Sequence, residues 1–427
     1  METPIHNFIN EYNYRDPARF HMPGHKGDAS IFGASADITE VKGTEDLIER
    51  SEANASEIFG CPTYYSAEGS SLAIRAMLSL LMRRTGKKTV VAARNCHQAF
   101  ISTCALLDLE VVWIPSDGDL LAAGFELSSL ELLLAGTEPC CVYITSPDYL
   151  GFVSDISSIA AICHSHGVYL AVDNAHGAYL KFFGSHPMDL GADICCDSAH
   201  KTLPVLTGGA YLHVSDELNR SDVRRELALF ASTSPSWLIL ASLDRANAIM
   251  ADPEFIKSLK KTADRVSSLI ENIRVKTYGN EYLKITICPN SFGYTGDEVA
   301  DMLRLFEIEP EFSDMNYVTL MFSPYNKPDE FNRLISALES IDRQDPIDLS
   351  GYKLPKTDRA VSIREAVFSK TEVISVDDAA GRIAGFVKTS CPPAVPIVVA
   401  GERISYEHIE ILKAYGFETI EVCCDFE

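Results

Sequence analysis

The sequence predicts an α/β fold, in which a large part with a mostly parallel sheet is followed by a smaller α+β region. Short runs of β-branched and apolar residues recur from about residue 63 to residue 214, and helical stretches separate them. Strands that alternate with helices in this way pair in parallel and are covered by helices on both faces. A chain of 427 residues, 46% of them hydrophobic, is also long enough for more than one domain.

The N-terminal stretch predicts an arm and then a helix. Residues 1–36 are rich in proline and glycine, which favours an arm over a domain. An amphipathic pattern in residues 37–61 predicts a helix that Gly60 closes as a C-cap. A strand end then leads through Ser70 and Ser71 into an apolar helix. The start of such a helix binds anions through its backbone N–H groups, although a serine that merely caps the helix is the alternative.

Strands and helices then alternate along the chain. Strands are expected at residues 88–93, 109–114, 140–145, 168–173, 193–196 and 209–214, with helices at 97–107 and 155–166. The residues that follow parallel strands meet at the edge of the sheet where ligands bind. His97, Asp173 and Lys201 each come just after a predicted strand, so they are candidate functional residues.

The last part of the chain predicts more helices and a second, smaller sheet. The expected helices are 216–229, one after Pro235, 255–273, 297–306 and 328–341, and the expected strands are 282–287 and 318–322. A stretch rich in proline and aspartate near residues 343–358 predicts a linker. The expected organisation is an arm (1–36), a large domain (37–250) and a C-terminal region (251–427).

Lys201 stands beside Ser198 and His200 in the segment Asp197-Ser-Ala-His-Lys201. A lysine that forms a Schiff base must be partly desolvated to lose its proton near neutral pH, and a strand end that opens into a cleft provides this. The serine and the histidine can hydrogen-bond an oxyanion beside it. A phosphate-bearing aldehyde such as pyridoxal 5'-phosphate (PLP) would use all three residues, while a solvated loop is the alternative.

Asp173 ends an apolar strand, Val168-Tyr-Leu-Ala-Val-Asp173. A carboxylate at this place can pair with a protonated pyridine nitrogen and keep the ring an electron sink. An aspartate that caps a strand-to-helix turn is the alternative. Both signals lie at the ends of apolar runs, which favours the cofactor.

Six motifs together resemble those of the Orn/Lys/Arg decarboxylases, PLP enzymes of the aspartate-aminotransferase fold (PLP fold type I). They are His21-Met-Pro-Gly-His-Lys-Gly27, Arg94-Asn-Cys-His97, Ser146-Pro-Asp-Tyr-Leu-Gly151, Asp173-Asn-Ala-His-Gly177, Ser198-Ala-His-Lys-Thr-Leu203 and Ser232-Thr-Ser-Pro235. Their order and rough spacing match over nearly the whole chain, as in a short form without the extra N-terminal domain of larger members.

The resemblance implies a decarboxylase of arginine, lysine or ornithine that yields an amine or a polyamine precursor. Lys201, His97 and Asp173 are then the catalytic residues, and His97 stacks on the ring. The implied cofactor-binding residues are Ser70, Ser71, His97, Asp173, Ala175, His176, Ser198, His200, Lys201, Thr233 and Ser234. The loop Ser232–Ser234 is expected to cross a homodimer interface to the partner's cofactor phosphate.

Some positions depart from the family pattern. Asn174 replaces an acidic residue, Asp148 replaces threonine, and Ala73 and Ile74 stand where glycine and asparagine are commoner. Near the C-terminus, Cys391 replaces an aromatic residue and Ala394 replaces glycine. Two alternatives therefore stay open: another PLP-dependent reaction, such as transamination or elimination, and a non-catalytic paralogue that acts as a binding or regulatory subunit.

Composition narrows the class of partner. A net charge of −23 and the absence of a clustered basic surface argue against nucleic acid. The 12 cysteines include no Cys-x-x-Cys pair, so neither disulfides nor a metal site is expected. No signal peptide or apolar run of membrane-spanning length is visible, which predicts a cytoplasmic protein with a small amino-acid substrate.

Overall fold

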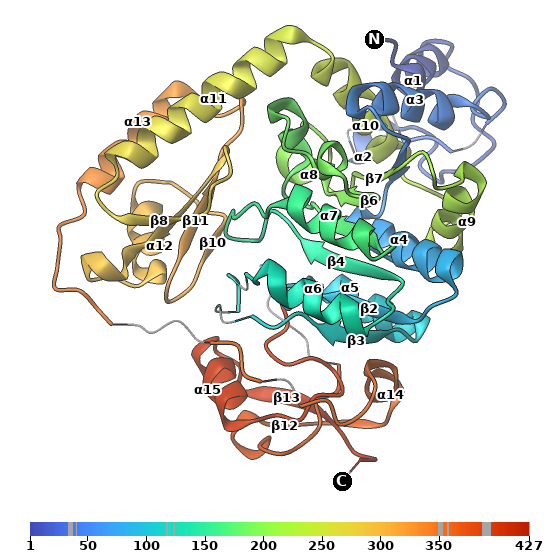
Figure 1. Cartoon of the computed structure of the whole chain (residues 1–427). Helices are drawn as coiled ribbons and strands as arrows, with labels where there is room; N and C mark the ends of the chain where they lie inside the picture. The colour runs from blue at the N-terminus through green and yellow to red at the C-terminus, as the bar shows by residue number, and fades with distance from the viewer. Residues whose placement is uncertain are drawn as a thin grey trace. The chain divides into compact units, whose positions relative to one another are not determined.

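The computed structural model describes all residues except 33–36, 40, 117, 119, 123, 349–352, 357, 387–393 and 427. The chain falls into two compact units (Figure 1). The first unit comprises residues 1–87, 140–143 and 156–256, and the second comprises residues 88–139, 144–155 and 257–427. The predicted boundaries at residues 36 and 250 stay predictions.

The large sheet has seven strands in the order β1-β7-β6-β5-β4-β2-β3. The strands are β1 (Thr63–Ser66), β2 (Thr89–Ala92), β3 (Glu110–Trp113), β4 (Cys141–Thr145), β5 (Tyr169–Asp173), β6 (Ile194–Asp197) and β7 (Ala210–Val214). β2 pairs with β3 and β5 pairs with β6 in parallel, while β7 runs antiparallel to both β6 and β1. The predicted α/β class with a mostly parallel sheet is confirmed.

The antiparallel direction of β7 follows from the short connection before it. Only the helix α8 (Ala199–Thr202) lies between β6 and β7. A parallel crossover usually needs a full helix to cross the face of the sheet, whereas residues 198–209 contain only this single helical turn, so the connection returns the chain in the opposite direction. Lys201 lies in this short connection, directly beyond the end of β6.

The helices of the first unit cover the sheet and extend to the N-terminus. They are α1 (Pro4–Tyr14), α2 (Ala29–Phe32), α3 (Leu47–Phe59), α4 (Gly69–Thr85), α7 (Ile156–Ser165), α9 (Arg220–Phe230) and α10 (Trp237–Met250), with 3-10 turns η1 (Ala178–Phe183) and η2 (Pro187–Leu190). Figure 1 shows α4 along the sheet, where it contacts β5, β6 and β7 and packs against α9. Gly60 adopts the left-handed conformation at the end of α3, which confirms the predicted C-cap.

The predicted N-terminal arm contains a helix that the sequence interpretation missed. Pro4 occupies the first turn of α1, a position at which its missing N–H costs nothing. Ile5, Ile9 and Tyr12 follow at helical spacing and are buried, and α1 packs against α3 and α10. The apolar spacing outweighs the proline-rich and glycine-rich character of the stretch as a whole.

The second unit contains the smaller α+β region that the sequence predicts. An antiparallel sheet has the order β10-β11-β9-β8, with β8 (Lys276–Tyr278), β9 (Lys284–Cys288), β10 (Phe312–Ser313) and β11 (Val318–Met321). Its helices are α11 (Pro253–Asn272, of which the first four residues belong to the first unit), α12 (Gly296–Leu305) and α13 (Pro328–Glu339), with the turn η3 (Pro289–Phe292). Their apolar faces share one buried cluster with the strands, around Val266, Ile285 and Leu303.

The rest of the second unit consists of short elements. They are α5 (Gln98–Leu107), α6 (Leu127–Gly136), α14 (Ile363–Phe368), η4 (Val376–Asp378), α15 (Tyr406–Ala414) and the antiparallel pair β12 (Thr371–Ser375) and β13 (Thr419–Cys423). Among the residues that the structure describes, no helix combines the length and the apolar character that a membrane crossing requires.

Candidate active site

Lys201 lies in α8, just beyond the end of β6. Its side chain is half-buried, and its Nζ is 3.0 Å from Nε2 of His176, a residue that is 4% exposed. A neutral imidazole nitrogen at this distance can accept a proton from an ammonium group. The structure therefore brings the predicted lysine together with one of the predicted cofactor-binding histidines.

Asp173 ends β5 and is 1% exposed. One carboxylate oxygen, Oδ2, accepts a hydrogen bond of 3.1 Å from the Tyr143 hydroxyl, and Oδ1 accepts one of 3.1 Å from the backbone N–H of Ala175. The Cys196 thiol lies 3.6 Å from the same Oδ1. Every one of these neighbours donates to the carboxylate and so holds it in a fixed orientation.

Sequence reasoning missed Tyr143 and Cys196 as neighbours of Asp173. Tyr143 lies on β4 and Cys196 on β6, the two strands that flank β5 in the sheet. Both side chains are fully buried. The only signal in the sequence was their position in apolar strand-like runs, and the pairing order that turns them toward Asp173 is not visible there.

Three of the predicted phosphate ligands gather at the start of α4. This helix begins at Gly69 without a side-chain cap, and Ser70 and Ser71 form its first turn. The Ser198 hydroxyl donates a hydrogen bond of 2.8 Å to Oγ of Ser70. An uncapped start of a 17-residue helix with hydroxyl groups beside it is a suitable site for an anion.

His200 turns one ring nitrogen to the protein backbone. Its Nδ1 lies 3.0 Å from the carbonyl oxygen of Gly209, which can only accept, so Nδ1 carries the hydrogen and donates it. Only Nε2 is left for a ligand. Burial lowers the pKa of His200, and the positive charge of the nearby Lys201 lowers it further.

Thr233 and Ser234 lie in the exposed loop between α9 and α10. The backbone N–H of the preceding Ser232 donates a hydrogen bond of 2.7 Å to the Glu68 carboxylate, and Glu68 directly precedes α4. The loop therefore reaches the start of α4 within its own chain. The cap of α10 itself is Ser236, whose hydroxyl accepts from the backbone N–H of Ile239.

His97 belongs to the second unit. It caps α5, because its Nδ1 accepts a hydrogen bond of 3.0 Å from the backbone N–H of Ala99. The role in ring stacking that the resemblance implies for His97 stays a prediction, as does the contact of Ala175 with a ring.

Two of the atypical residues have clear structural roles. Ala394 has φ of 55°, and its carbonyl accepts a hydrogen bond of 2.8 Å from the N–H of Gln98. This left-handed conformation explains why glycine is commoner there. Asp148 accepts hydrogen bonds from the N–H of Phe152 and the hydroxyl of Tyr278, so it caps a turn. Cys391 lies outside the described residues.

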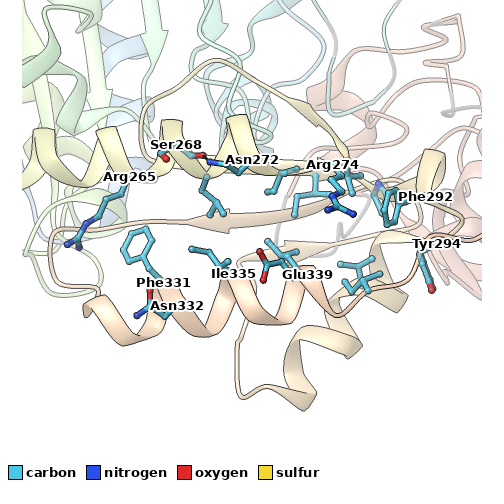
Figure 2. A pocket seen from close by; sticks show the side chains of 18 of the residues that line it. Arg265, Ser268, Asn272, Arg274, Phe292, Tyr294, Phe331, Asn332, Ile335 and Glu339 are labelled. Carbon is cyan, nitrogen blue, oxygen red and sulfur yellow. Dashed lines mark hydrogen bonds between the residues drawn. The ribbon is translucent and has the colours of Figure 1, made fainter.

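A cavity of about 720 Å³ lies in the second unit, between α11 and α13 (Figure 2). Its lining is largely apolar and includes Leu269, Ile287 and Phe331, and Arg274 and Glu339 also border it. Large apolar pockets are the usual first candidate for a ligand site. None of the predicted site residues lines this cavity. The candidate active site is therefore at the ends of β5 and β6, where Asp173 and Lys201 lie.

Comparison with known proteins agrees with the geometry. A family profile described as Orn/Lys/Arg decarboxylase, major domain, matches residues 3–277, and one described as Orn/Lys/Arg decarboxylase, C-terminal domain, matches residues 353–418. An arginine decarboxylase of Bacillus subtilis (strain 168) is 30% identical, over 96% of this chain and 93% of its own.

Solved structures share the fold. The lysine decarboxylase of Francisella novicida superposes with a TM-score of 0.81 at 16% identity, covering 99% of this chain and 81% of its own. A cysteine desulfurase of Thermococcus onnurineus NA1 superposes with a TM-score of 0.56 at 17% identity, over 79% of this chain and 91% of its own.

Proposed function

The chain belongs to the Orn/Lys/Arg decarboxylase family, and from this premise we propose that it decarboxylates a basic amino acid with the help of PLP. The observation that carries the proposal is the placement of Lys201 and Asp173 at the carboxyl ends of two adjacent parallel strands, β6 and β5. A nucleophilic amine and a buried carboxylate at one edge of a sheet are the two groups that PLP chemistry requires.

The residues at this edge fit PLP. The uncapped start of α4, with Ser70 and Ser198, offers donors to a phosphate group. The buried hydroxyl of Thr202, next to Lys201 in the chain, has no hydrogen-bond partner among the described residues. The predicted holders of the phosphate are Ser70, Ser71, Ser198, His200, Thr233 and Ser234.

When bound, PLP supplies an electron sink for the pair left behind by the departing carboxylate. Asp173 holds a proton on the pyridine nitrogen, for which its carboxylate must stay ionised. The Tyr143 hydroxyl and the Ala175 N–H, each at 3.1 Å, hold that carboxylate in place by donating to it. Lys201 provides the amine to which the aldehyde attaches.

His176 is the proton acceptor for Lys201 in this proposal. Its Nε2 lies 3.0 Å from Nζ, within the distance over which a proton passes between two nitrogens. The imidazole would orient the amine and could exchange a proton with it when PLP is bound. Lys201 or His97 would supply the proton that the α-carbon needs after loss of carbon dioxide.

Arginine, lysine and ornithine are the substrates to compare. Curated relatives from Bacillus subtilis and Bacillus anthracis are named arginine decarboxylase, and the solved neighbours include lysine decarboxylases. We propose arginine as the first substrate to test, because relatives with that name match more than nine-tenths of this chain. A net charge of −23 also favours a cationic substrate over an anionic one.

The test is release of labelled carbon dioxide. Purified protein with PLP is mixed with each amino acid labelled in the α-carboxylate, and Lys201→Ala is compared with Lys260→Ala, an exposed lysine on α11. We expect release from one basic amino acid, retained by Lys260→Ala and abolished by Lys201→Ala. Label retained in a keto acid would identify an aminotransferase instead, and no turnover of any of the three would favour a non-catalytic paralogue.

We further propose that the protein works as a homodimer, or as a higher homo-oligomer built from it, as the family resemblance implies. The exposure of Thr233 and Ser234 on the α9–α10 loop supports a role in reaching a second copy. Light scattering of the PLP-loaded protein tests this assembly: a mass of twice 47.0 kDa is expected, and a stable monomer with full activity would contradict it.

A further inference from the structure

We infer that Asp197 is a positioning residue, which ties the ends of β5 and β6 together and so fixes where Asp173 and Lys201 face. The inference rests on the proposed function, because it gives these two residues their purpose. It concerns a residue outside the predicted site, fully buried at the end of β6.

The carboxylate of Asp197 is surrounded by donors. Its Oδ1 accepts a hydrogen bond of 2.6 Å from Nδ2 of Asn174. Its Oδ2 lies 3.1 Å from Nε2 of His186 and 3.0 Å from Nε2 of His213. An ionised carboxylate can only accept, so both imidazoles carry a hydrogen on Nε2 and donate it.

The Asn174–Asp197 bond lies where the two strands end. Asn174 directly follows Asp173, and Asp197 lies four positions before Lys201. The backbone N–H of Asn174 also donates a bond of 2.9 Å to the carbonyl of Cys196. The side-chain bond therefore adds one more cross-strand link beyond the backbone ladder, at the strand ends that carry the two residues needed by the proposed chemistry.

The histidines attach this link to the rest of the first unit. His186 caps η2, where its Nδ1 accepts from the N–H of Met188, and His213 lies on β7, with Nδ1 2.9 Å from the Thr63 hydroxyl on β1. Both imidazoles are 0% exposed. η2 and β7 thus hold the carboxylate directly, and β1 in turn holds His213.

The charge of Asp197 is maintained by these neighbours. Burial alone would raise the pKa of Asp197, but the adjacent His186 and His213 outweigh it and hold that pKa well below its usual range. Without the carboxylate, the buried donors Asn174, His186, His213 and Cys195 would lose their acceptor, which is costly at a buried site.

Some of the side chains around Asp197 could also form a metal site. His186, Cys195 and Asp197 each offer a ligand atom, and these atoms lie within 4.8 Å of one another. The Cys195 thiol lies 3.7 Å from Oδ1 of Asp197, so it too points at that carboxylate as a hydrogen-bond donor. Both imidazoles also point at one carboxylate oxygen at hydrogen-bond distance, which favours the hydrogen-bonded arrangement.

The experiment uses Asp197→Asn in the full-length protein, with Asn174→Ala as a milder second variant that removes only the cross-strand bond. Both are compared with Asp244→Asn, another aspartate that is 0% exposed, whose partners are the Ser51 hydroxyl and the N–H of His6. The measurements are the PLP dissociation constant and the pH titration of the visible band of bound PLP.

We expect Asp197→Asn to raise the PLP dissociation constant about tenfold or more and to move the pH titration of the band, since buried donors lose their acceptor. Asn174→Ala should shift both in the same direction by a smaller factor, about threefold or more. Asp244→Asn should leave the band unchanged, and kcat should fall more than KM changes in the two site variants.

Unchanged PLP affinity and an unchanged band in Asn174→Ala and in folded Asp197→Asn would overturn the inference. One equivalent of zinc in the purified protein would overturn it as well, in favour of a metal site. A wild type that binds PLP with the expected band but releases no carbon dioxide would contradict only the proposed function. A wild type that binds no PLP would refute both.

Discussion

The ionisation of Asp148, a buried residue of the second unit, should make the stability of the protein depend on pH. Its side chain is 5% exposed, and it lies near the buried pair of Glu281 and Lys284, whose charged atoms are 3.4 Å apart. Burial, which outweighs the bonds from Phe152 and Tyr278, raises the pKa of Asp148 from 3.8 to about 6. The folded protein therefore binds this proton more tightly than the unfolded chain does.

The sign of the pH effect follows from this difference. Between pH 3.8 and about 6 the folded state holds more protons than the unfolded state, so stability falls as the pH rises through that window. Above it, the shift from 3.8 to about 6 amounts to about 3 kcal/mol, at about 1.4 kcal/mol per pKa unit. Below pH 3.8 the penalty disappears.

The substitution Asp148→Asn removes the charge and keeps both hydrogen bonds, because the amide oxygen can accept from the Phe152 N–H and the amide nitrogen can donate to the Tyr278 hydroxyl. We expect the free energy of unfolding of the variant to exceed that of the wild type by about 1–3 kcal/mol at pH 8 and by less than about 1 kcal/mol at pH 4.

Urea unfolding followed by circular dichroism at both pH values measures this difference, with Asp264→Asn on the exposed face of α11 as a control that should change nothing. An Asp148→Asn variant that is less stable than the wild type at pH 8, or that shows the same difference at both pH values, would refute the reasoning.

Two further predictions concern the stability of the fold, with one substitution in each unit. Arg94 is 4% exposed and donates to the carbonyls of Pro396 and Ile397 at 2.9 and 3.2 Å. The substitution Arg94→Lys should lower the free energy of unfolding by about 1–3 kcal/mol, seen as a lower urea midpoint. The substitution Arg304→Lys, at an exposed arginine, should leave the midpoint unchanged. Gly60 has φ of 68° at the end of α3, so Gly60→Ala should cost about 1 kcal/mol in the same assay; a variant as stable as the wild type would contradict the strain at that cap.

The strands of the large sheet were predictable because each is a short apolar run between helices. The predicted run 168–173 became β5 (Tyr169–Asp173), and 209–214 became β7 (Ala210–Val214). A short, continuous apolar run between helices is typical of a strand that is buried on both faces of a parallel sheet.

Other elements carry weaker signals. The helix α6 (Leu127–Gly136) was missed, and it lies between strands in a stretch whose leucines are partly exposed. The pair β12 and β13 was missed as well, because β12 has no buried residue and β13 alternates in only part of its length. Patterns that are half solvated do not distinguish a strand from a loop.

At the site, the sequence identified residues but not contacts. Lys201 and Asp173 were predicted from strand ends, whereas the bond of His176 to Lys201 and the donation of Tyr143 to Asp173 depend on tertiary packing. Asp197 was visible only as the start of a motif. Its two histidine partners lie 11 positions before it and 16 after it, on other elements, and no local pattern links them.

The central claim is that the amine of Lys201 captures the aldehyde of PLP at the end of β6. Borohydride reduction of the PLP-loaded protein, followed by mass spectrometry of its peptides, tests this claim most directly. The account predicts one phosphopyridoxyl group on the peptide that contains Lys201 and none on the Lys201→Ala protein. A label on a different lysine, or no label on a protein that still decarboxylates its substrate, would contradict it.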